Sequence, residues 1–221
     1  MERVAIIGAG GHAREVLDIF DALNADTPRI EVLGWLVEPA YGRAGALVHD
    51  RPILGDLDWL ADHVHDVHTV CAVGEPALRR RLVERVRPLG ARFCRAIHPG
   101  AVLTRRVAIG DGVAIAAGSV LTNTIRLGNH VHVNAGCTIA HDTVLEDFVT
   151  LSPGVHIAGG AILGTGCSVG TGANIIPRVR LGAWSIVGAG CTVLADVPAD
   201  STVVGVPGRV IARRAPGWHL G

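Results

Sequence analysis

The dipeptide His141-Asp142 is the strongest candidate for chemistry in this sequence of 221 residues. An imidazole changes its protonation near neutral pH, and a neighbouring carboxylate can orient it and stabilise the imidazolium. The pair therefore has the parts of a general base and its partner. Asn134 lies seven residues earlier and is a further polar side chain. We expect these residues to act only if the elements around them place them on a surface that a substrate can reach.

The second candidate is the glycine-rich stretch Gly8-Ala9-Gly10-Gly11-His12. It follows an apolar run at 3–7 and precedes apolar residues at helical spacing over 14–20. We predict a strand, a turn and a helix whose N-terminus can hold a phosphate, with the His12 imidazole facing a ligand.

This turn admits more than one interpretation. Gly8, Gly10 and Ala13 satisfy the dinucleotide fingerprint. The α/β part spans only about 90 residues and lacks the second mononucleotide half of a dinucleotide-binding domain. We therefore favour a nucleotide sugar over NAD, and a purely structural turn stays open.

The elements that must position His141 and Asn134 follow a six-residue repeat. Every sixth position from Ile97 to Val193 is Ile, Leu or Val, without an insertion. A strict period of six is typical of a parallel β-helix, in which each hexad forms one side of a coil. Four residues after each aliphatic, the side chains are mostly small, as a narrow interior requires: Ser119, Cys137, Thr143, Ala161, Cys167, Ala173, Ser185 and Cys191.

Two further expectations come from this repeat. Glycines often follow the aliphatic directly (Gly110, Gly128, Gly164, Gly170, Gly182 and Gly188), and we expect them at corners with positive φ. Three of the five cysteines fall on the small inward column, where we expect reduced thiols that fill the core. His141 lies off the inward columns, so the repeat does not require it.

The rest of the chain predicts two domains and a tail. We expect further strands at 31–37 and 68–73, ending at Glu38 and Gly74, with a short helix near 56–63, a basic helix at 76–87 and a strand at 93–99 that enters the first coil. The predicted units are a Rossmann-like domain at 1–94, a β-helix at 95–195 and a C-terminal tail at 196–221.

Composition excludes several classes of partner. Charged residues make up 18% of the chain and the formal net charge is zero, so there is no electrostatic footprint for nucleic acid. No apolar run approaches the roughly 20 residues of a membrane span. The first residues lack the apolar core and cleavage site of a signal peptide. We expect no nucleic-acid partner, no membrane and a cytoplasmic location.

Together these motifs resemble one family over almost the whole chain. The segments Gly8–His12, Ile97-His98-Pro99, Asn134 with Ile139–Asp142, and Val204–Arg209 are similar to the nucleotide-sugar acetyltransferases of bacterial surface-glycan pathways. That family includes bacillosamine-type and perosamine-type N-acetyltransferases and sialic acid O-acetyltransferase-like proteins. The resemblance implies a half-Rossmann-like α/β domain, a left-handed parallel β-helix, acetyl-CoA as co-substrate without a metal, and a homotrimer with each site between two subunits.

The resemblance also implies roles for individual residues. His141 matches the catalytic base, Asp142 its acidic partner, and Asn134 a polar residue near the acceptor amine. The matched positions for the nucleotide sugar are Gly10, Gly11, His12, Val37, Glu38 and Gly74. Those for the thioester and pantetheine are Thr150, Gly159, Thr171 and Ala189. Candidates for the CoA phosphates are Arg178, Arg180 and Arg209.

The sequence departs from the family pattern at three positions. Thr150 stands where some members carry a second histidine, Val37 where some carry an acid, and Ala140 where a glutamate often precedes the base. These departures concern the identity of the acceptor more than the chemistry.

The expected reaction is direct transfer of an acetyl group to the 4-amino group of a nucleotide-linked amino-deoxy sugar. Backbone N–H near Gly159 would stabilise the oxyanion. O-acetylation of a sugar or sialic acid is an alternative, and a non-catalytic sugar-nucleotide-binding protein is an alternative from another class. A zinc-dependent β-helix hydratase is disfavoured, because His130, His132, His141 and His156 lack the ligand spacing of that family.

Overall fold

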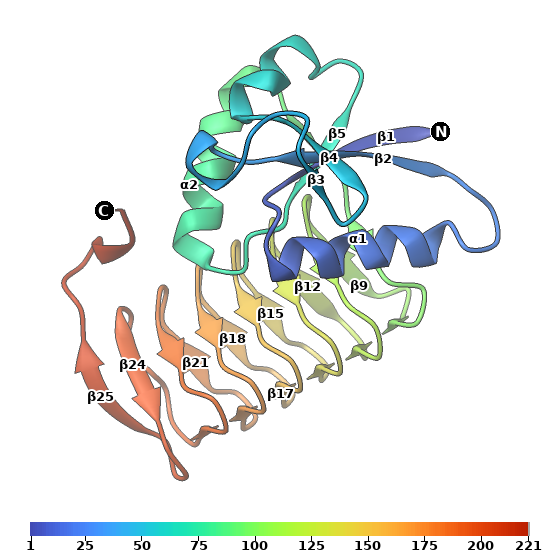
Figure 1. Cartoon of the computed structure of the whole chain (residues 1–221). Helices are drawn as coiled ribbons and strands as arrows, with labels where there is room; N and C mark the ends of the chain where they lie inside the picture. The colour runs from blue at the N-terminus through green and yellow to red at the C-terminus, as the bar shows by residue number, and fades with distance from the viewer. Residues whose placement is uncertain (221) are drawn as a thin grey trace.

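The structure is a computed structural model that describes residues 1–220. An N-terminal α/β domain lies against the side of a long parallel β-helix, and the C-terminus returns toward the α/β domain (Figure 1). The expected two-part architecture is confirmed. Between residues 1 and 220, no helix is both long and apolar enough to cross a membrane.

The α/β domain is built on one six-stranded sheet, which is parallel except for the pairing of its first two strands. Its order is β3 (Leu47–Val48), β4 (Arg51–Gly55), β2 (Ile30–Leu36), β1 (Glu2–Ile7), β5 (His68–Cys71) and β6 (Arg92–Phe93). Helices α1 (Gly11–Leu23) and α2 (Pro76–Val86) accompany it, with 3₁₀ turns at Pro39–Tyr41, Leu57–Asp62 and Arg87–Leu89.

Two local features of the sequence favour these helices, the apolar spacing in α1 and the cap at the start of α2. In α1 the buried residues Ala13, Val16, Leu17 and Phe20 recur at helical spacing and face the sheet. In α2 the Glu75 carboxylate caps the first turn by accepting from the backbone N–H of Ala77 and Leu78, and Pro76 occupies the first helical position.

One sequence-based expectation for this domain is wrong, and strands at the edge of its sheet were missed. We expected one strand at 93–99, but β6 pairs with β5 and the separate strand β7 (Ala96–Ile97) pairs with β10 of the β-helix. Strand β4 was not foreseen. It carries Pro52, which lacks an amide hydrogen, and joins the sheet beside β2.

The β-helix has three faces, and equivalent residues pair 18 positions apart. The first face contains β7, β10 (Ala114–Ile115), β13 (His132–Val133), β16 (Thr150–Leu151), β19 (Ser168–Val169), β22 (Ile186–Val187), β24 (Ser201–Val204) and β25 (Arg209–Arg213). The second contains β8 (Val102–Leu103), β11 (Val120–Leu121), β14 (Thr138–Ile139), β17 (His156–Ile157), β20 (Asn174–Ile175) and β23 (Thr192–Val193). The third contains β9 (Val107–Ile109), β12 (Ile125–Leu127), β15 (Val144–Leu145), β18 (Ile162–Leu163) and β21 (Arg180–Leu181).

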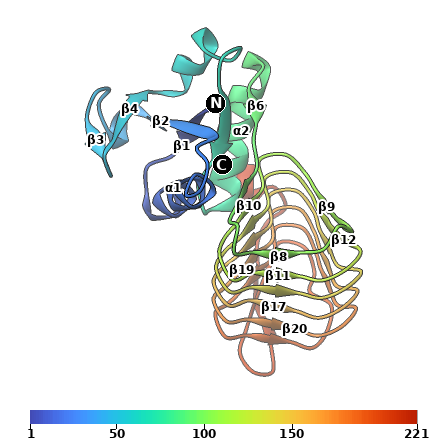
Figure 2. The same cartoon turned by 90° about the vertical axis from the view of Figure 1, so that its right-hand side faces the viewer.

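The stacked coils are visible in Figure 2, where the labelled strands of the three faces lie on three sides. Strand β24 extends the first face into the segment that we assigned to the tail, and β25 pairs with it antiparallel. The last described residues form a 3₁₀ turn, Trp218–Leu220, which contacts α2.

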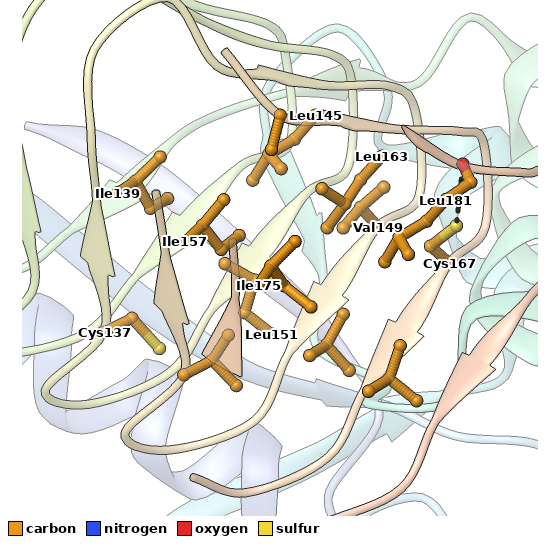
Figure 3. Close-up of a cluster of buried hydrophobic side chains, with 14 of the residues drawn as sticks. Cys137, Ile139, Leu145, Val149, Leu151, Ile157, Leu163, Cys167, Ile175 and Leu181 are labelled. Carbon is orange, nitrogen blue, oxygen red and sulfur yellow. Dashed lines mark hydrogen bonds between the residues drawn. The ribbon is translucent and has the colours of Figure 1, made fainter. Parts of the chain in front are cut away.

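The interior confirms the inward columns predicted by the repeat. Most of the aliphatics from Ile115 onward and all the small residues named above are at most 3% exposed. Figure 3 shows the side chains of Ile139, Ile157 and Ile175 in a row from successive coils, with Cys137 and Cys167 at small positions. Burial raises the pKa of the Cys167 thiol to about 11, so it stays protonated and fills space.

The explanation for the corner glycines is wrong. Positive φ falls three residues after the aliphatic, at glycines such as Gly136, Gly154 and Gly160, not one residue after it. Glycine is needed one residue after the aliphatic for a different reason. A Cβ on Gly170 would lie 2.6 Å from the backbone nitrogen of Ala189 on the next coil.

Candidate active site

Two cavities adjoin the segment that joins β1 to the first turns of α1. The α/β cavity, of about 430 Å³, is lined by Gly8, Ala9, Gly10, Val37, Glu38, Tyr41, Val73 and Leu78 among others. The interdomain cavity, of about 440 Å³, lies between the α/β domain and the first face and is lined by His12, Glu15, Gly74, Glu75, Asn134, Thr150, Trp184 and Trp218 among others. Both cavities use the same two loops, 8–12 and 73–78.

The N-terminus of α1 adjoins both cavities with its first turn uncapped. Gly10 is the N-cap residue and supplies no side-chain hydrogen bond, and the first turn carries no acidic residue. A Cβ on Gly10 or Gly74 would meet no atom within 4 Å, so neither glycine is required by internal packing. The free N–H groups of a helix N-terminus with open space in front suit an anion such as a diphosphate.

His12 lines the interdomain cavity, but its imidazole is already engaged by protein groups. Its Nε2 lies 2.9 Å from Nδ1 of His132, and its Nδ1 lies 3.2 Å from a carboxylate oxygen of Glu15. Burial lowers the pKa of His12, Glu15 opposes that shift, and the nearby Arg79 cation adds to it. The imidazole is therefore held in the wall of the cavity.

His141 and Asp142 lie on the edge between the second and third faces. Asp142 has φ of 60°, a left-handed conformation that an aspartate tolerates better than most side chains. The His141 ring lies over Gly159, where a Cβ would come within 2.7 Å of Nε2. Nδ1 of His141 lies 2.8 Å from Oδ2 of Asp142, and because an ionised carboxylate only accepts, Nδ1 donates and the exposed Nε2 is left with a lone pair.

Asn134 lies on a different edge, between the first and second faces. Its amide donates to the Leu151 carbonyl at 2.6 Å, and the residue lines the interdomain cavity. Thr171 and Ala189 lie on exposed turns along the same edge, where the N–H of Gly190 donates to the carbonyl of Thr171. A single chain therefore brings Asn134, Thr171 and Ala189 to one edge, and His141 and Gly159 to another.

The remaining predicted residues take three kinds of position. Thr150 is buried in the wall of the interdomain cavity, where its hydroxyl donates to the Gly74 carbonyl at 3.0 Å. Val37 and Glu38 line the α/β cavity, and Glu38 accepts from Arg85 at 2.8 Å. The three candidates for the CoA phosphates, Arg178, Arg180 and Arg209, are exposed.

Sequence reasoning missed four residues around the interdomain cavity. Trp184 and Trp218 line it. The fully buried Arg79 and His132 contact residues of its lining, Thr150 and His12 respectively. Trp184 stacks on His219 with ring centroids 3.8 Å apart. Tryptophans in a chain with only four of them were the one available signal. Among residues 1–220, no group of three or more His, Cys, Asp or Glu side chains is placed to hold a metal ion.

Comparisons with known proteins identify the family. A family profile described as the PglD N-terminal domain matches residues 3–86. The UDP-N-acetylbacillosamine N-acetyltransferase of Bacillus subtilis (strain 168) is 34% identical over 117 residues, which are 53% of this chain. The chain spans about half the length of this curated relative, 52%.

Solved structures match over nearly the full length. A mutant of perosamine N-acetyltransferase from Caulobacter crescentus, in complex with CoA and GDP-perosamine, is similar with a TM-score of 0.86 and 31% identity, covering 96% of this chain and 98% of that one. The acetyltransferase domain of PglB from Neisseria gonorrhoeae FA1090, in complex with acetyl coenzyme A, has a TM-score of 0.85 and 30% identity over 95% and 99% of the two chains.

These neighbours share both the α/β domain and the left-handed β-helix that the sequence predicted. With an identity above 30% across almost the whole of the perosamine enzyme, and a matching N-terminal profile, this chain belongs to the nucleotide-sugar acetyltransferase family.

Proposed function

We propose that this protein transfers the acetyl group of acetyl-CoA to the 4-amino group of a nucleotide-linked amino-deoxy sugar. One observation carries the proposal: the two cavities are lined by neighbouring residues of the same two segments, and at the open N-terminus of α1 the N-cap Gly10 lines one cavity and His12 the other. A nucleotide sugar has three parts in the same order. The nucleoside suits the α/β cavity, the diphosphate the helix N-terminus, and the hexose the interdomain cavity beside Asn134.

The His141–Asp142 pair supports a direct transfer. The acceptor amine attacks the thioester carbonyl, and the Nε2 lone pair of His141 takes its proton while Asp142 stabilises the imidazolium. The new C–N bond forms as the C–S bond breaks, and CoA leaves and regains a proton. The amide N–H of Gly159 donates to no backbone carbonyl among residues 1–220, so it is available to the oxyanion. General-base catalysis of this kind contributes roughly 10²–10⁴-fold.

The separation of the two edges supports a homotrimer. His141 and Gly159 cannot face the Asn134 edge of their own chain, because the second face lies between the two edges. A threefold assembly that places the His141 edge of one copy against the Asn134 edge of the next would complete the site. The pantetheine of acetyl-CoA would then lie between Thr171 and Ala189 of one copy and Gly159 of its neighbour. The free cysteines, four of them buried, fit a reducing compartment, and we propose the cytoplasm.

The relatives support the donor and acceptor classes. The perosamine N-acetyltransferase structure holds CoA and GDP-perosamine together, and the PglB domain holds acetyl coenzyme A. Structures of the perosamine enzyme include variants in which one histidine is replaced by asparagine or by alanine.

The test is CoA release from acetyl-CoA with UDP-, GDP- and dTDP-linked 4-amino-6-deoxy sugars and with free sialic acid. We expect turnover on one nucleotide amino sugar, a fall of at least 10²-fold in kcat for His141→Asn, and wild-type activity for the control His65→Asn, an exposed imidazole in the α/β domain. Turnover on sialic acid alone would instead support O-acetylation. Full activity of His141→Asn would refute the assignment of the base.

A further inference from the structure

Arg79 of α2 is a fully buried cation with no carboxylate partner. Its side chain is 0% exposed, and no acidic oxygen among residues 1–220 lies within 4 Å of it. Burial lowers the pKa of the guanidinium to about 10, so it remains charged at neutral pH. An unpaired buried charge costs several kcal/mol unless hydrogen bonds satisfy it. Such a residue needs a role that a hydrophobic side chain could not fill.

The hydrogen bonds of Arg79 join the two domains at the interdomain cavity. Within the α/β domain, Nη1 donates to the carbonyls of Val73 and Gly74 at 2.7 and 3.1 Å. Across the domain boundary, Nη2 donates to the carbonyl of Phe148 at 2.7 Å and to the Thr150 hydroxyl at 2.9 Å. Gly74 and Thr150 both line the cavity. The Arg79 guanidinium therefore forms hydrogen bonds to both walls of the interdomain cavity.

A second branch of these contacts reaches His12 through His132. Nη1 of Arg79 lies 3.2 Å from Nδ1 of His132, and Nε2 of His12 lies 2.9 Å from the same nitrogen. A carboxylate only accepts, so Nδ1 of His12 donates to Glu15, and Nε2 of a neutral His12 is an acceptor. Nδ1 of His132 must then donate to that Nε2, while Nη1 of Arg79, whose two hydrogens go to the Val73 and Gly74 carbonyls, packs against the same nitrogen at 3.2 Å.

We propose that Arg79 and His132 are positioning residues that fix the ring orientation and the tautomer of His12 in the wall of the acceptor cavity. The Glu15 carboxylate, oriented by the Nδ1–H of His12, then presents an acceptor that suits an amine or hydroxyl donor on the ligand. The identity of the ligand rests on the proposed function, whereas the chain of contacts from Arg79 through His132 to His12, which we call the relay, does not.

The charges around His12 agree with this arrangement. Glu15 and Arg14 lie on its own helix, Arg79 and Glu75 on or before α2, and His132 on β13. Burial, followed by Arg79, His12 and His130, lowers the pKa of His132 well below its usual value. Both imidazoles are therefore neutral at neutral pH, as the relay requires.

The first experiment uses the ligand-free protein labelled with ¹⁵N-histidine. Long-range ¹H–¹⁵N spectra between pH 5.5 and 8 report the tautomer of each imidazole, and His12→Asn and His132→Asn assign the signals. We expect His132 to stay neutral with its hydrogen on Nδ1, and we expect Arg79→Met to raise the pKa of His12 and to release the His132 tautomer. His132 with its hydrogen on Nε2, or a His12 titration unmoved in Arg79→Met, would overturn the proposal.

The second experiment measures kinetics with acetyl-CoA and the nucleotide sugar. His132→Asn keeps an amide N–H donor near the place of Nδ1, whereas His132→Leu removes it. We expect His132→Leu to raise KM for the nucleotide sugar roughly tenfold, as loss of an orienting partner does elsewhere, with KM for acetyl-CoA unchanged and with recovery in His132→Asn.

Controls separate positioning from folding. Arg92→Met removes an exposed arginine that donates only to carbonyls of the α/β domain, and it should keep wild-type kinetics. If Arg79→Met does not fold, the two His132 variants still decide the question. Equal KM values in wild type, His132→Leu and His132→Asn would overturn the proposal. If no sugar is turned over by any variant, the proposed function fails while the spectra still test the relay.

Discussion

At the scale of single residues, the position of the candidate base His141 depends on two residues around its ring, Gly159 and Asp142. The His141 imidazole occupies the space that a side chain at position 159 would need. The neighbouring Asp142 adopts a left-handed conformation that brings its carboxylate to Nδ1. Gly159 and Asp142 therefore fix the position of the His141 ring, the first by leaving space for it and the second by a hydrogen bond to Nδ1.

Gly159→Ala tests this arrangement. The new methyl group would lie 2.6 Å from Cε1 of His141 and displace the ring from its place over residue 159. Position 159 does not have a positive φ, so we expect little loss of stability and a fall in kcat of roughly tenfold or more. The control is the double variant: combined with His141→Ala, the same substitution should add nothing further. An additive loss would mean that Gly159 acts independently of the imidazole.

A second prediction at this scale concerns acid stability. His130 is 1% exposed between Phe93 and Phe148, and burial, together with Arg79 and Arg87, lowers its pKa to about 3. An unfolded histidine binds its proton near pH 6.5. Between these values the unfolded state holds more protons, so the free energy of unfolding should fall as pH drops, by about 1.4 kcal/mol per pH unit for this residue.

Urea denaturation at pH 7.5, 6 and 5 checks that slope. Asparagine tolerates the φ of 55° at this position, so His130→Asn should fold with lower stability at pH 7.5 and with a shallower acid slope. The exposed His65→Asn is the matched control and should keep the wild-type slope. An unchanged slope in His130→Asn would show that this imidazole titrates within the folded protein.

At the scale of elements, the C-terminal 3₁₀ turn completes the interdomain cavity. Trp218 lines that cavity. Trp184 lies between α2 and the chain end, with the Arg80 guanidinium 5.6 Å from its ring centre and His219 stacked on it. A segment more than 80 residues after Asn134 thus shares a wall with it, and hydrophobic periodicity does not report such a contact.

Trp218→Ala should weaken binding of the sugar part of the substrate. An aromatic wall contributes about 1 kcal/mol through contact with an apolar surface, which corresponds to roughly a fivefold rise in KM for the nucleotide sugar. Trp218→Phe should retain most of the affinity. Leu220→Ala, at a side chain 62% exposed, is the control. If KM in Trp218→Ala equals that of the wild type, this ring does not contact the acceptor.

At the scale of the whole molecule, the positions of His141 and Asn134 on two edges of the β-helix imply that two copies of the chain contribute different residues to one site. Under the proposed assembly, a working site needs His141 from one chain and Asn134 from the next. Two inactive variants, His141→Asn and Asn134→Ala, can then repair each other in mixed trimers. With random mixing of equal amounts, about a quarter of the sites would contain both wild-type residues.

Co-expression of the two variants with different affinity tags, followed by purification through both tags, isolates the mixed assemblies. We expect CoA release well above that of either variant alone, and sedimentation should show three chains per particle. Activity no greater than the mean of the two variants would contradict a site shared between chains. Mixing the purified variants without exchange of subunits is the control and should restore nothing.

The contribution of the sequence differs from one part of the molecule to another. The hexads from Ile97 to Val193 determine the β-helix, because one aliphatic and one small residue per side leave few other ways to close a narrow core. The glycine turn with its helix, and the pair His141-Asp142, could likewise be read locally. The strand β4 could not, because its place beside β2 depends on a neighbour and not on its own pattern.

Only the tertiary structure decided how distant groups combine into a cavity. Local pattern places His12 at a helix start, but the approach of His132 across 120 residues and the burial of Arg79 against the carbonyl of Phe148 follow from how the α/β domain docks on the first face. The three-faced coil of the β-helix itself separates Asn134 from His141 by a full face. The repeat settles the fold because its interactions are periodic and local. The walls of the site required the folded chain because each is made of residues that have no pattern in common.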